Sequence, residues 1–245
     1  MVILSRNDIE KISRKVLARY LALTEQKLTC IDPVDFAEKL YGIRFVITDI
    51  SVTGMLLGVT SFSDISITIP CGNGYGRTFE LDGKVAYIDQ RLEQQSNPGR
   101  LNFTLMHEVA HQVLGEYFPE EYNFQTQPII CRYADESYRR PICWPEWQTN
   151  VLASCLLMPK ELIRKHMAAL GMGNTIKRLN RVFSPGDYRL FSQLADMLGV
   201  SKTALSIRLN HLGMVARNDF YDPYALVNVF PEDHEYNSLY REGDQ

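Results

Sequence analysis

Histidine and cysteine are scarce in this chain, and long apolar runs are absent from it. Its 245 residues include five histidines and five cysteines. The cysteines, at positions 30, 71, 131, 143 and 155, show neither regular nor C-x-x-C spacing. This argues against a disulfide framework and indicates reduced thiols. A second metal site or a disulfide at Cys131 and Cys143 is therefore not favoured.

No stretch reaches the ~20 consecutive apolar residues that a membrane-spanning helix needs. Residues 1–4 are apolar, but the sequence turns polar at Ser5, far short of the apolar region of a signal peptide. We therefore expect a cytoplasmic protein with no membrane partner. An apolar content of 45% is sufficient for a substantial core.

Two of the few histidines lie in one segment, residues 103–114, with the sequence FTLMHEVAHQVL. It places His107, Glu108 and His111 in an H-E-x-x-H pattern, which chance would produce in less than about one such chain in a hundred. Residues four apart lie one turn above each other on a helix, so both imidazoles can bind one zinc ion. Glu108 can then serve as the base that directs a water at a carbonyl group.

The same segment has the features of an amphipathic helix. Asn97 suits the N-cap, Pro98 suits the first helical position, and Gly115 predicts the C-terminal end. Apolar residues recur at helical spacing and would anchor the helix in a core. A metal site is therefore favoured over a surface helix with two ordinary histidines.

A catalytic zinc ion requires a third protein ligand. Glu146 opens a second apolar segment, EWQTNVLASCLLMP, which predicts a buried helix that begins just after Pro145 and is ended by Pro159. Asn150 lies one turn beyond Glu146 and could hydrogen-bond a ligand. A role of Glu146 in complementing only the helix dipole is less favoured.

Together the two segments resemble the signature of the ImmA/IrrE family of metallo-endopeptidases, which pairs F-T-L-x-H-E-x-x-H with E-x-Q-A-N-x-F-A-x-x-L-L-M-P. This chain has Thr149 where the family usually has Ala and Leu152 where it usually has Phe. We interpret both as packing positions. The resemblance implies a Zn²⁺ ion bound by His107, His111 and Glu146, with Glu108 as the catalytic base.

The resemblance also implies an α+β fold, a minimal zincin-like metallopeptidase domain with a short mixed β-sheet beside the active-site helices. We expect this domain over residues 1–159. Helical periodicity predicts helices at residues 9–23 and 33–40, and strands are predicted at 43–47, 55–60, 65–69 and 84–89. Residues 85–89 are the expected edge strand on which a substrate peptide would pair.

The character of the chain changes after Pro159. Residues 160–217 hold ten Lys or Arg against three Asp or Glu, whereas residues 218–245 hold one against seven. Residues 190–209 predict two short helices joined by Gly-Val-Ser, so we expect a helical helix-turn-helix-like region over 160–217 and an acidic C-terminal tail over 218–245. DNA binding would require side chains of the second helix to reach the major groove, namely Lys202, Thr203, Ser206 and Arg208. A packing role is favoured over DNA binding, because the whole chain is acidic, with a net charge of −3.

The predicted function is that of a zinc-dependent endopeptidase. As the resemblance implies, it would cut a specific partner protein, a helix-turn-helix repressor or an antitoxin, and so relieve repression. A DNA-binding transcriptional regulator with an idle or structural zinc site is the alternative, and a zinc-stabilised scaffold that sequesters its partner is a third. The residue that stabilises the oxyanion stays open among Tyr117, Tyr122, Tyr133, Tyr138, His166 and His211.

Overall fold

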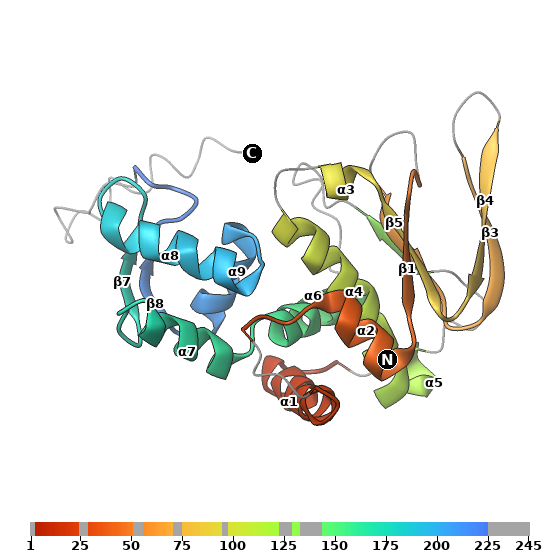
Figure 1. Ribbon diagram of the computed structural model, residues 1–245, viewed down its shortest axis with the longest axis horizontal. Coiled ribbons are helices and arrows are strands. Elements are labelled where there is room, and N and C mark those ends of the chain that lie inside the picture. Colours follow the sequence, from red (N-terminus) through yellow and green to blue (C-terminus); the bar gives the residue numbers. More distant parts are fainter. Residues whose placement is uncertain are drawn as a thin grey trace, which may run out of the picture.

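The computed structural model describes residues 3–24, 29–50, 56–70, 75–94, 98–122, 129–132 and 144–224. Figure 1 shows strands at one end of the molecule, a group of helices in the middle and a second helical group at the other end. This mixture of helices and small sheets is the predicted α+β architecture. Among the described helices, none combines the length and the apolar character that crossing a membrane requires.

Half of the described strands belong to a four-stranded sheet, in the order β1 (Arg44–Thr48), β5 (Val85–Asp89), β2 (Leu56–Thr60) and β6 (Ile129–Arg132). The β1–β5 pair is parallel, and the β5–β2 and β2–β6 pairs are antiparallel. A separate antiparallel hairpin consists of β3 (Asp64–Pro70) and β4 (Gly76–Asp82), and a parallel pair consists of β7 (Ile176–Leu179) and β8 (Val215–Asn218). The sequence patterns did not predict β4, β6, β7 or β8.

Strand β5 lies inside the four-stranded sheet and not at its edge. It pairs with β1 on one side, where Arg44 lies opposite Val85, and with β2 on the other, where Gly58 lies opposite Ile88. The prediction that residues 85–89 would pair with a substrate peptide is therefore wrong, because both sides of this strand already have a hydrogen-bonded neighbour. A hydrophobic pattern identifies a strand but does not identify its neighbours.

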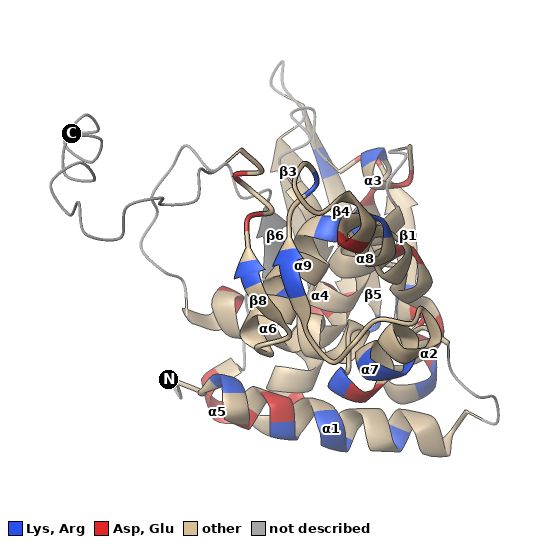
Figure 2. Cartoon of the chain, turned by 90° about the vertical axis from the view of Figure 1, so that its left-hand side faces the viewer, with Lys and Arg blue, Asp and Glu red and all other residues tan. Residues whose placement is uncertain are grey.

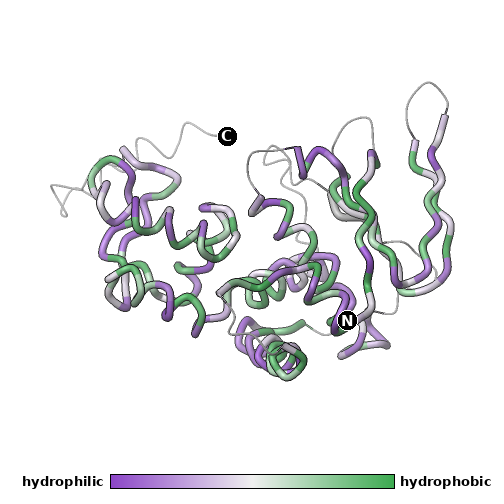
Figure 3. Tube along the Cα trace, in the orientation of Figure 1, coloured by the Kyte–Doolittle hydropathy of each residue, from purple (hydrophilic) through white to green (hydrophobic). Residues whose placement is uncertain are grey.

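The helices are α1 (Arg6–Ala22), α2 (Pro33–Tyr41), α3 (Arg91–Gln94), α4 (Pro98–Tyr117), α5 (Pro119–Tyr122), α6 (Trp144–Leu157), α7 (Lys160–Ala169), α8 (Pro185–Leu198) and α9 (Lys202–His211). Side-chain caps define the starts of α1 and α2, since Ser5 accepts from the backbone N–H of Asp8 and Asp32 accepts from that of Val34. In the middle of the molecule α4 packs against α6, and the second half of α6, residues 151–157, is mainly hydrophobic (Figure 3). This packing places the first turn of α6 beside the middle of α4.

Helix α4 does not end at Gly115 as predicted but continues to Tyr117. A Cβ atom on Gly115 would overlap the ring of Phe62, so the glycine allows this aromatic side chain to lie against the helix. Its role is therefore close packing and not helix termination. The predicted N-cap, Asn97, lies outside the described residues.

The predicted helix-turn-helix-like pair is present as α8 and α9. Gly199 follows α8 in the left-handed conformation with φ of 65°, close to the 63° of Gly42 after α2. The side chain of Ser201 caps α9. Figure 2, which faces this side of the molecule, shows Lys and Arg on α1, α7 and β8. Leu205 and Leu209 of α9 belong to the same hydrophobic core as Val109 of α4. The domain boundary at residue 159 stays a prediction, and one core extends on both sides of it.

The first turn of α4 contacts the turn between α8 and α9. The side-chain amide of Asn102 donates to the carbonyl of Gly199 at 2.8 Å. A Cβ atom on Gly99 would overlap the backbone of Val200 and Ser201. The two backbones therefore approach as closely as a glycine permits.

Candidate metal centre

Three predicted ligands come together where α4 and α6 meet. His107 and His111 lie one turn apart on α4 and are buried, while Glu146 projects from the first turn of α6 and has 38% of its side chain exposed. The Nε2 atoms of the two histidines are 3.1 Å apart. Nε2 of His107 lies 3.3 Å from Oε2 of Glu146, and Nε2 of His111 lies 3.6 Å from Oε1 of the same carboxylate.

These distances fit a single metal ion. Two donors bound at ~2.1 Å to a tetrahedral metal are separated by roughly 3.4 Å, which is close to all three observed separations. His107, His111 and Glu146 also form the one group of three His, Cys, Asp or Glu side chains with metal-binding geometry among the described residues. Two imidazoles and one carboxylate leave a fourth position for water or substrate, as catalytic zinc sites do.

The hydrogen bond of His107 fixes which ring nitrogen faces the site. Its Nδ1 lies 3.0 Å from the amide oxygen of Asn150, as expected for a residue one turn beyond Glu146. An amide oxygen only accepts, so Nδ1–H of His107 is the donor and Nε2 keeps a free lone pair. Asn150 thus orients the imidazole in the form that a metal ligand requires.

Thr149 does the same for His111, which corrects its interpretation as a packing position only. The hydroxyl of Thr149 donates to the carbonyl of Pro145 at 2.9 Å. Its oxygen, 3.3 Å from Nδ1 of His111, therefore accepts from that nitrogen. Sequence reasoning missed this contact because it joins two helices, and the departure from the usual Ala was the only signal for it.

The electrostatics of the three donors favour the protonation states that metal binding needs. Burial and, to a smaller extent, His107 lower the pKa of His111 to about 3 against the opposing effect of Glu146, so His111 is neutral at physiological pH. Burial acts to raise the pKa of Glu146, but the proximity of His107 and His111 outweighs it and holds the pKa below its ordinary value. A neutral His111 imidazole therefore faces an ionised carboxylate.

Glu108 lies beside these donors with its carboxylate unsatisfied. It is buried, and neither of its oxygens has a hydrogen-bond partner within the described part of the chain. The pKa of Glu108 is raised to about 7, mainly by burial; His107 opposes this rise and the charge of Glu146 adds to it. A carboxyl group with such a pKa can accept and return a proton near neutral pH.

Strand β2 closes the other side of Glu108. A Cβ atom on Gly58 would overlap Oε1 of Glu108, so only glycine at this position leaves room for the carboxylate. Sequence reasoning did not single out Gly58, although an isolated glycine within an apolar strand segment is a signal of close approach. The sheet thus contributes space to the site rather than a ligand.

Two candidates for stabilising an oxyanion are engaged elsewhere. The hydroxyl of Tyr122 accepts a hydrogen bond from Gln148 at 2.7 Å, and His166 Nε2 bonds the carbonyl of Thr29. Tyr133 and Tyr138 lie outside the described residues. Tyr117 is half-buried in the core. His211 lines a cavity whose wall also includes Asn150.

Of the four polar side chains of α9 that would have to reach a DNA groove, Lys202 and Thr203 are exposed and the other two are not. Ser206 and Arg208 are buried. The guanidinium of Arg208 pairs with the carboxylate of Glu10 and donates from Nε to the carbonyl of Met158 at 3.1 Å. Ser206 Oγ donates to the side-chain oxygen of Asn218 at 3.3 Å. The structure therefore uses these two side chains for packing, which was the favoured interpretation.

The fold and this group of side chains define the class of protein: an α+β domain with the arrangement of a zincin-like metallopeptidase. A family model described as the IrrE N-terminal-like domain, Peptidase_M78, matches residues 70–210, which is more than half of the chain. The chain belongs to this family, that of the ImmA/IrrE metallopeptidases. No protein of curated function matches it.

Proposed function

We propose that this chain is a zinc-dependent endopeptidase that hydrolyses a peptide bond in a specific partner protein. The observation that carries the proposal is the convergence of His107, His111 and Glu146 at tetrahedral spacing, next to the unsatisfied carboxylate of Glu108. Membership of a metallopeptidase family supports it independently. Two histidines and a glutamate are also a ligand set used by zinc peptidases.

The residues divide the chemistry among them. His107, His111 and Glu146 would hold the ion, with Asn150 and Thr149 orienting the two imidazoles. When bound, zinc supplies Lewis acidity, which polarises a carbonyl group and lowers the pKa of a water molecule towards neutrality. The ligands are buried or half-buried, so the protein excludes most solvent from the reacting atoms.

Glu108 would act as the general base and then as the proton donor. Burial raises the pKa of Glu108, which suits both steps, since the carboxylate can take a proton from the attacking water and give it to the leaving nitrogen. Because neither oxygen is held by another group in the described residues, the carboxylate is available for this transfer. Gly58 keeps the space that it occupies.

The partner that we propose, from the family resemblance, is a helix-turn-helix repressor or an antitoxin, whose cleavage would relieve repression in the cytoplasm. A DNA-binding regulator with an idle zinc site is the second candidate, supported by the α8–α9 pair. Burial of Ser206 and Arg208 in α9 weighs against it. A scaffold that sequesters its partner without cutting it is the third candidate.

Replacing Glu108 by Gln separates these candidates. The purified full-length chain is loaded with zinc and incubated with a repressor-like protein encoded beside it, and products are followed by mass spectrometry. We expect cleavage by the wild-type chain and a loss of roughly 100- to 10,000-fold in rate for Glu108→Gln, with one zinc retained. Glu116→Gln is the matched control, since Glu116 is an exposed glutamate on the same helix, paired with Arg19.

Each outcome selects a candidate. Continued cleavage by Glu108→Gln would remove Glu108 from the mechanism. Stable complex formation without any cleavage by the zinc-loaded wild-type chain would favour the scaffold. Retardation of duplex DNA at moderate salt, abolished by Lys202→Ala on the exposed side of α9, would favour the regulator.

A further inference from the structure

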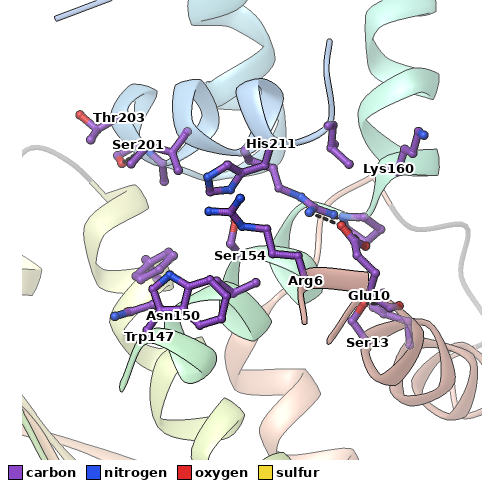
Figure 4. A pocket seen from close by; sticks show the side chains of 18 of the residues that line it. Arg6, Glu10, Ser13, Trp147, Asn150, Ser154, Lys160, Ser201, Thr203 and His211 are labelled. Carbon is purple, nitrogen blue, oxygen red and sulfur yellow. Dashed lines mark hydrogen bonds and ion pairs between the residues drawn. The ribbon is translucent and has the colours of Figure 1, made fainter. Parts of the chain in front are cut away.

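A cavity of about 830 Å³ lies between the candidate metal centre and the α8–α9 pair. Figure 4 shows its walls, which come from α1, the first turns of α4, the exposed face of α6, the start of α7, and α9. Ligand-binding pockets typically have volumes of about 300–1,000 Å³, so this cavity has the size of a binding site. No residue of the proposed catalytic machinery other than Asn150 lines it.

Helix α6 connects the cavity to the metal centre. Glu146 lies in the first turn of this helix. Trp147, the next residue, and Asn150, one turn further on, line the cavity. Asn150 also holds His107 through the hydrogen bond at 3.0 Å. Leu57, which precedes Gly58 in β2, lines the cavity as well. A peptide segment bound here would therefore continue directly to the metal donors.

The charged groups that line the cavity are mainly cationic. The guanidinium of Arg208 is neutralised by the carboxylate of Glu10. Among the other charged side chains, Arg6, Arg14 and Lys160 are basic and Glu161 is acidic. Burial is the main cause that lowers the pKa of His211, and the charge of Arg6 acts in the same direction. A ligand with negative charge is therefore favoured.

The cavity also offers apolar surface next to these cations. Phe103, Trp147, Val151 and Ile207 all line it, and Ile207 is 43% exposed although it lies on a packed helix. The guanidinium of Arg6 lies 5.7 Å from the centre of the Trp147 ring, so a cation and an aromatic face are presented together. Arg and Trp are the residue types that most often anchor protein ligands.

We propose that this cavity binds an acidic segment of the substrate protein, in which carboxylate side chains flank an apolar residue, and thereby brings a nearby peptide bond to the metal centre. The second half of this inference rests on the proposed endopeptidase function, whereas binding in the cavity does not. Duplex DNA fits less well, because Arg208 of α9 is engaged by Glu10 and by the carbonyl of Met158.

The two tryptophans of the chain make the cavity directly observable. Trp144 and Trp147 are in edge-to-face contact, with ring centres 5.7 Å apart, and Trp147 lines the cavity. Zinc-loaded, full-length Glu108→Gln protein is titrated with a decapeptide that has Leu between Asp and Glu residues and contains no Trp or Tyr. Its matched peptide carries Asn and Gln in place of the acids. We expect a saturable change in tryptophan emission and an affinity about tenfold higher for the acidic peptide, decreasing with salt.

Variants on opposite walls assign the effect to the cavity. Arg6→Gln and Lys160→Gln should each weaken binding of the acidic peptide about fivefold and leave binding of the neutral peptide unchanged. Arg6→Glu should weaken it more than Arg6→Gln. The matched control is Arg164→Gln, which removes the same charge from an exposed position of α7 outside the cavity and should leave the affinity unchanged. Thermal melting confirms that each variant is folded.

Equal affinity for the two peptides, or unchanged affinity in both Arg6→Gln and Lys160→Gln, would overturn the proposal. It would also be wrong if a single-stranded oligonucleotide displaced the peptide at a lower concentration than the peptide itself requires, since the cavity would then be a nucleic-acid site. Because binding is read in a variant that should not cut, absence of cleavage by the wild-type chain would refute the endopeptidase function and leave this result standing.

Discussion

The metal centre and helix α9 both bury polar side chains, but they satisfy them differently. At the metal centre, the Nε2 atoms of His107 and His111 face each other at 3.1 Å, and both oxygens of Glu108 lack a hydrogen-bond partner in the described residues. In α9, Arg208 and Ser206 are as deeply buried, yet each bonds to groups of neighbouring elements. The first set is incomplete and the second is complete.

This difference separates a functional site from an architectural one. Buried polar groups in proteins are nearly always hydrogen-bonded, so an unsatisfied set marks a place where something from outside must bind. A satisfied set instead holds elements together, as Arg208 does for α9, α1 and the residue that follows α6. Both regions carry a motif that can be recognised in the sequence, and only the state of their hydrogen bonds distinguishes them.

The largest effect should follow from removing a donor at the incomplete set. We expect Glu146→Gln to lower zinc affinity by more than about 100-fold, since partners that only orient a ligand already contribute 10- to 100-fold. The free energy of unfolding of the metal-free protein should stay within about 0.5 kcal/mol, because the side chain is 38% exposed. Competition with a chromogenic chelator and urea unfolding measure the two quantities. Unchanged zinc affinity would exclude Glu146 as a ligand.

Removing a member of the complete set should have the opposite profile. Arg208→Met leaves Glu10 and the carbonyl of Met158 without their partner, and we expect the free energy of unfolding to fall by about 3 kcal/mol. Zinc affinity should be unchanged. Lys202→Met, at an exposed position of the same helix, is the control and should change stability by less than about 0.5 kcal/mol. A loss below 1 kcal/mol for Arg208→Met would contradict the architectural role.

A third change tests the space around the base. Gly58→Ala places a methyl group where the carboxylate of Glu108 lies, so the carboxylate must move. We expect the cleavage rate to fall about 10- to 100-fold, because small displacements of catalytic groups have effects of this size. Zinc content should be unchanged. Gly173→Ala, where an added Cβ meets nothing within 4 Å, should have wild-type activity.

A smaller effect should come from the partner of His111. Thr149→Ala removes the acceptor of its Nδ1–H, and we expect zinc affinity to fall about tenfold. Thr149→Ser keeps the hydroxyl and should restore most of the affinity, whereas Thr149→Val keeps the shape and should not. If Val behaved like Thr in the chelator competition, the hydroxyl would have no part in orienting His111.

The smallest effect concerns pH and the Glu10–Arg208 pair. Burial acts to raise the pKa of Glu10, but the hydrogen bond and the charge of Arg208 outweigh it and hold the pKa below 4.5. An acid whose pKa is lower in the folded state stabilises that state above its unfolded pKa and loses this contribution as pH falls through the folded value. Urea unfolding between pH 6 and pH 3 should therefore show a loss of stability that is shallower in Glu10→Gln. Equal slopes would exclude this linkage.

The sequence predicted the parts of the site that depend on local spacing. The H-E-x-x-H pattern located His107, Glu108 and His111 because helix geometry alone determines their relation. Glu146 and Asn150 followed from a second segment with a family resemblance. Their convergence with the histidines is shown by the coordinates, while the roles of ligand and base stay predictions.

The remainder depends on contacts between distant segments, which a pattern does not contain. Gly58 matters only because β2 passes against Glu108, and Thr149 only because α6 meets α4 at His111. Gly115 has the composition of a helix end, yet Phe62 from a distant loop determines its role. The interior position of β5 likewise depends on which strands flank it. Tertiary packing decided each of these.

The close approach at Gly99 means that α4 connects the α8–α9 turn to the metal centre. Its backbone at Gly99 contacts the α8–α9 turn at Val200 and Ser201. The imidazoles of His107 and His111 lie two to three turns further along the same helix. A displacement of the α8–α9 turn would therefore move α4, the helix that positions both imidazoles. A protein that binds this turn would therefore change the position of the two imidazoles through α4, without contacting the metal centre.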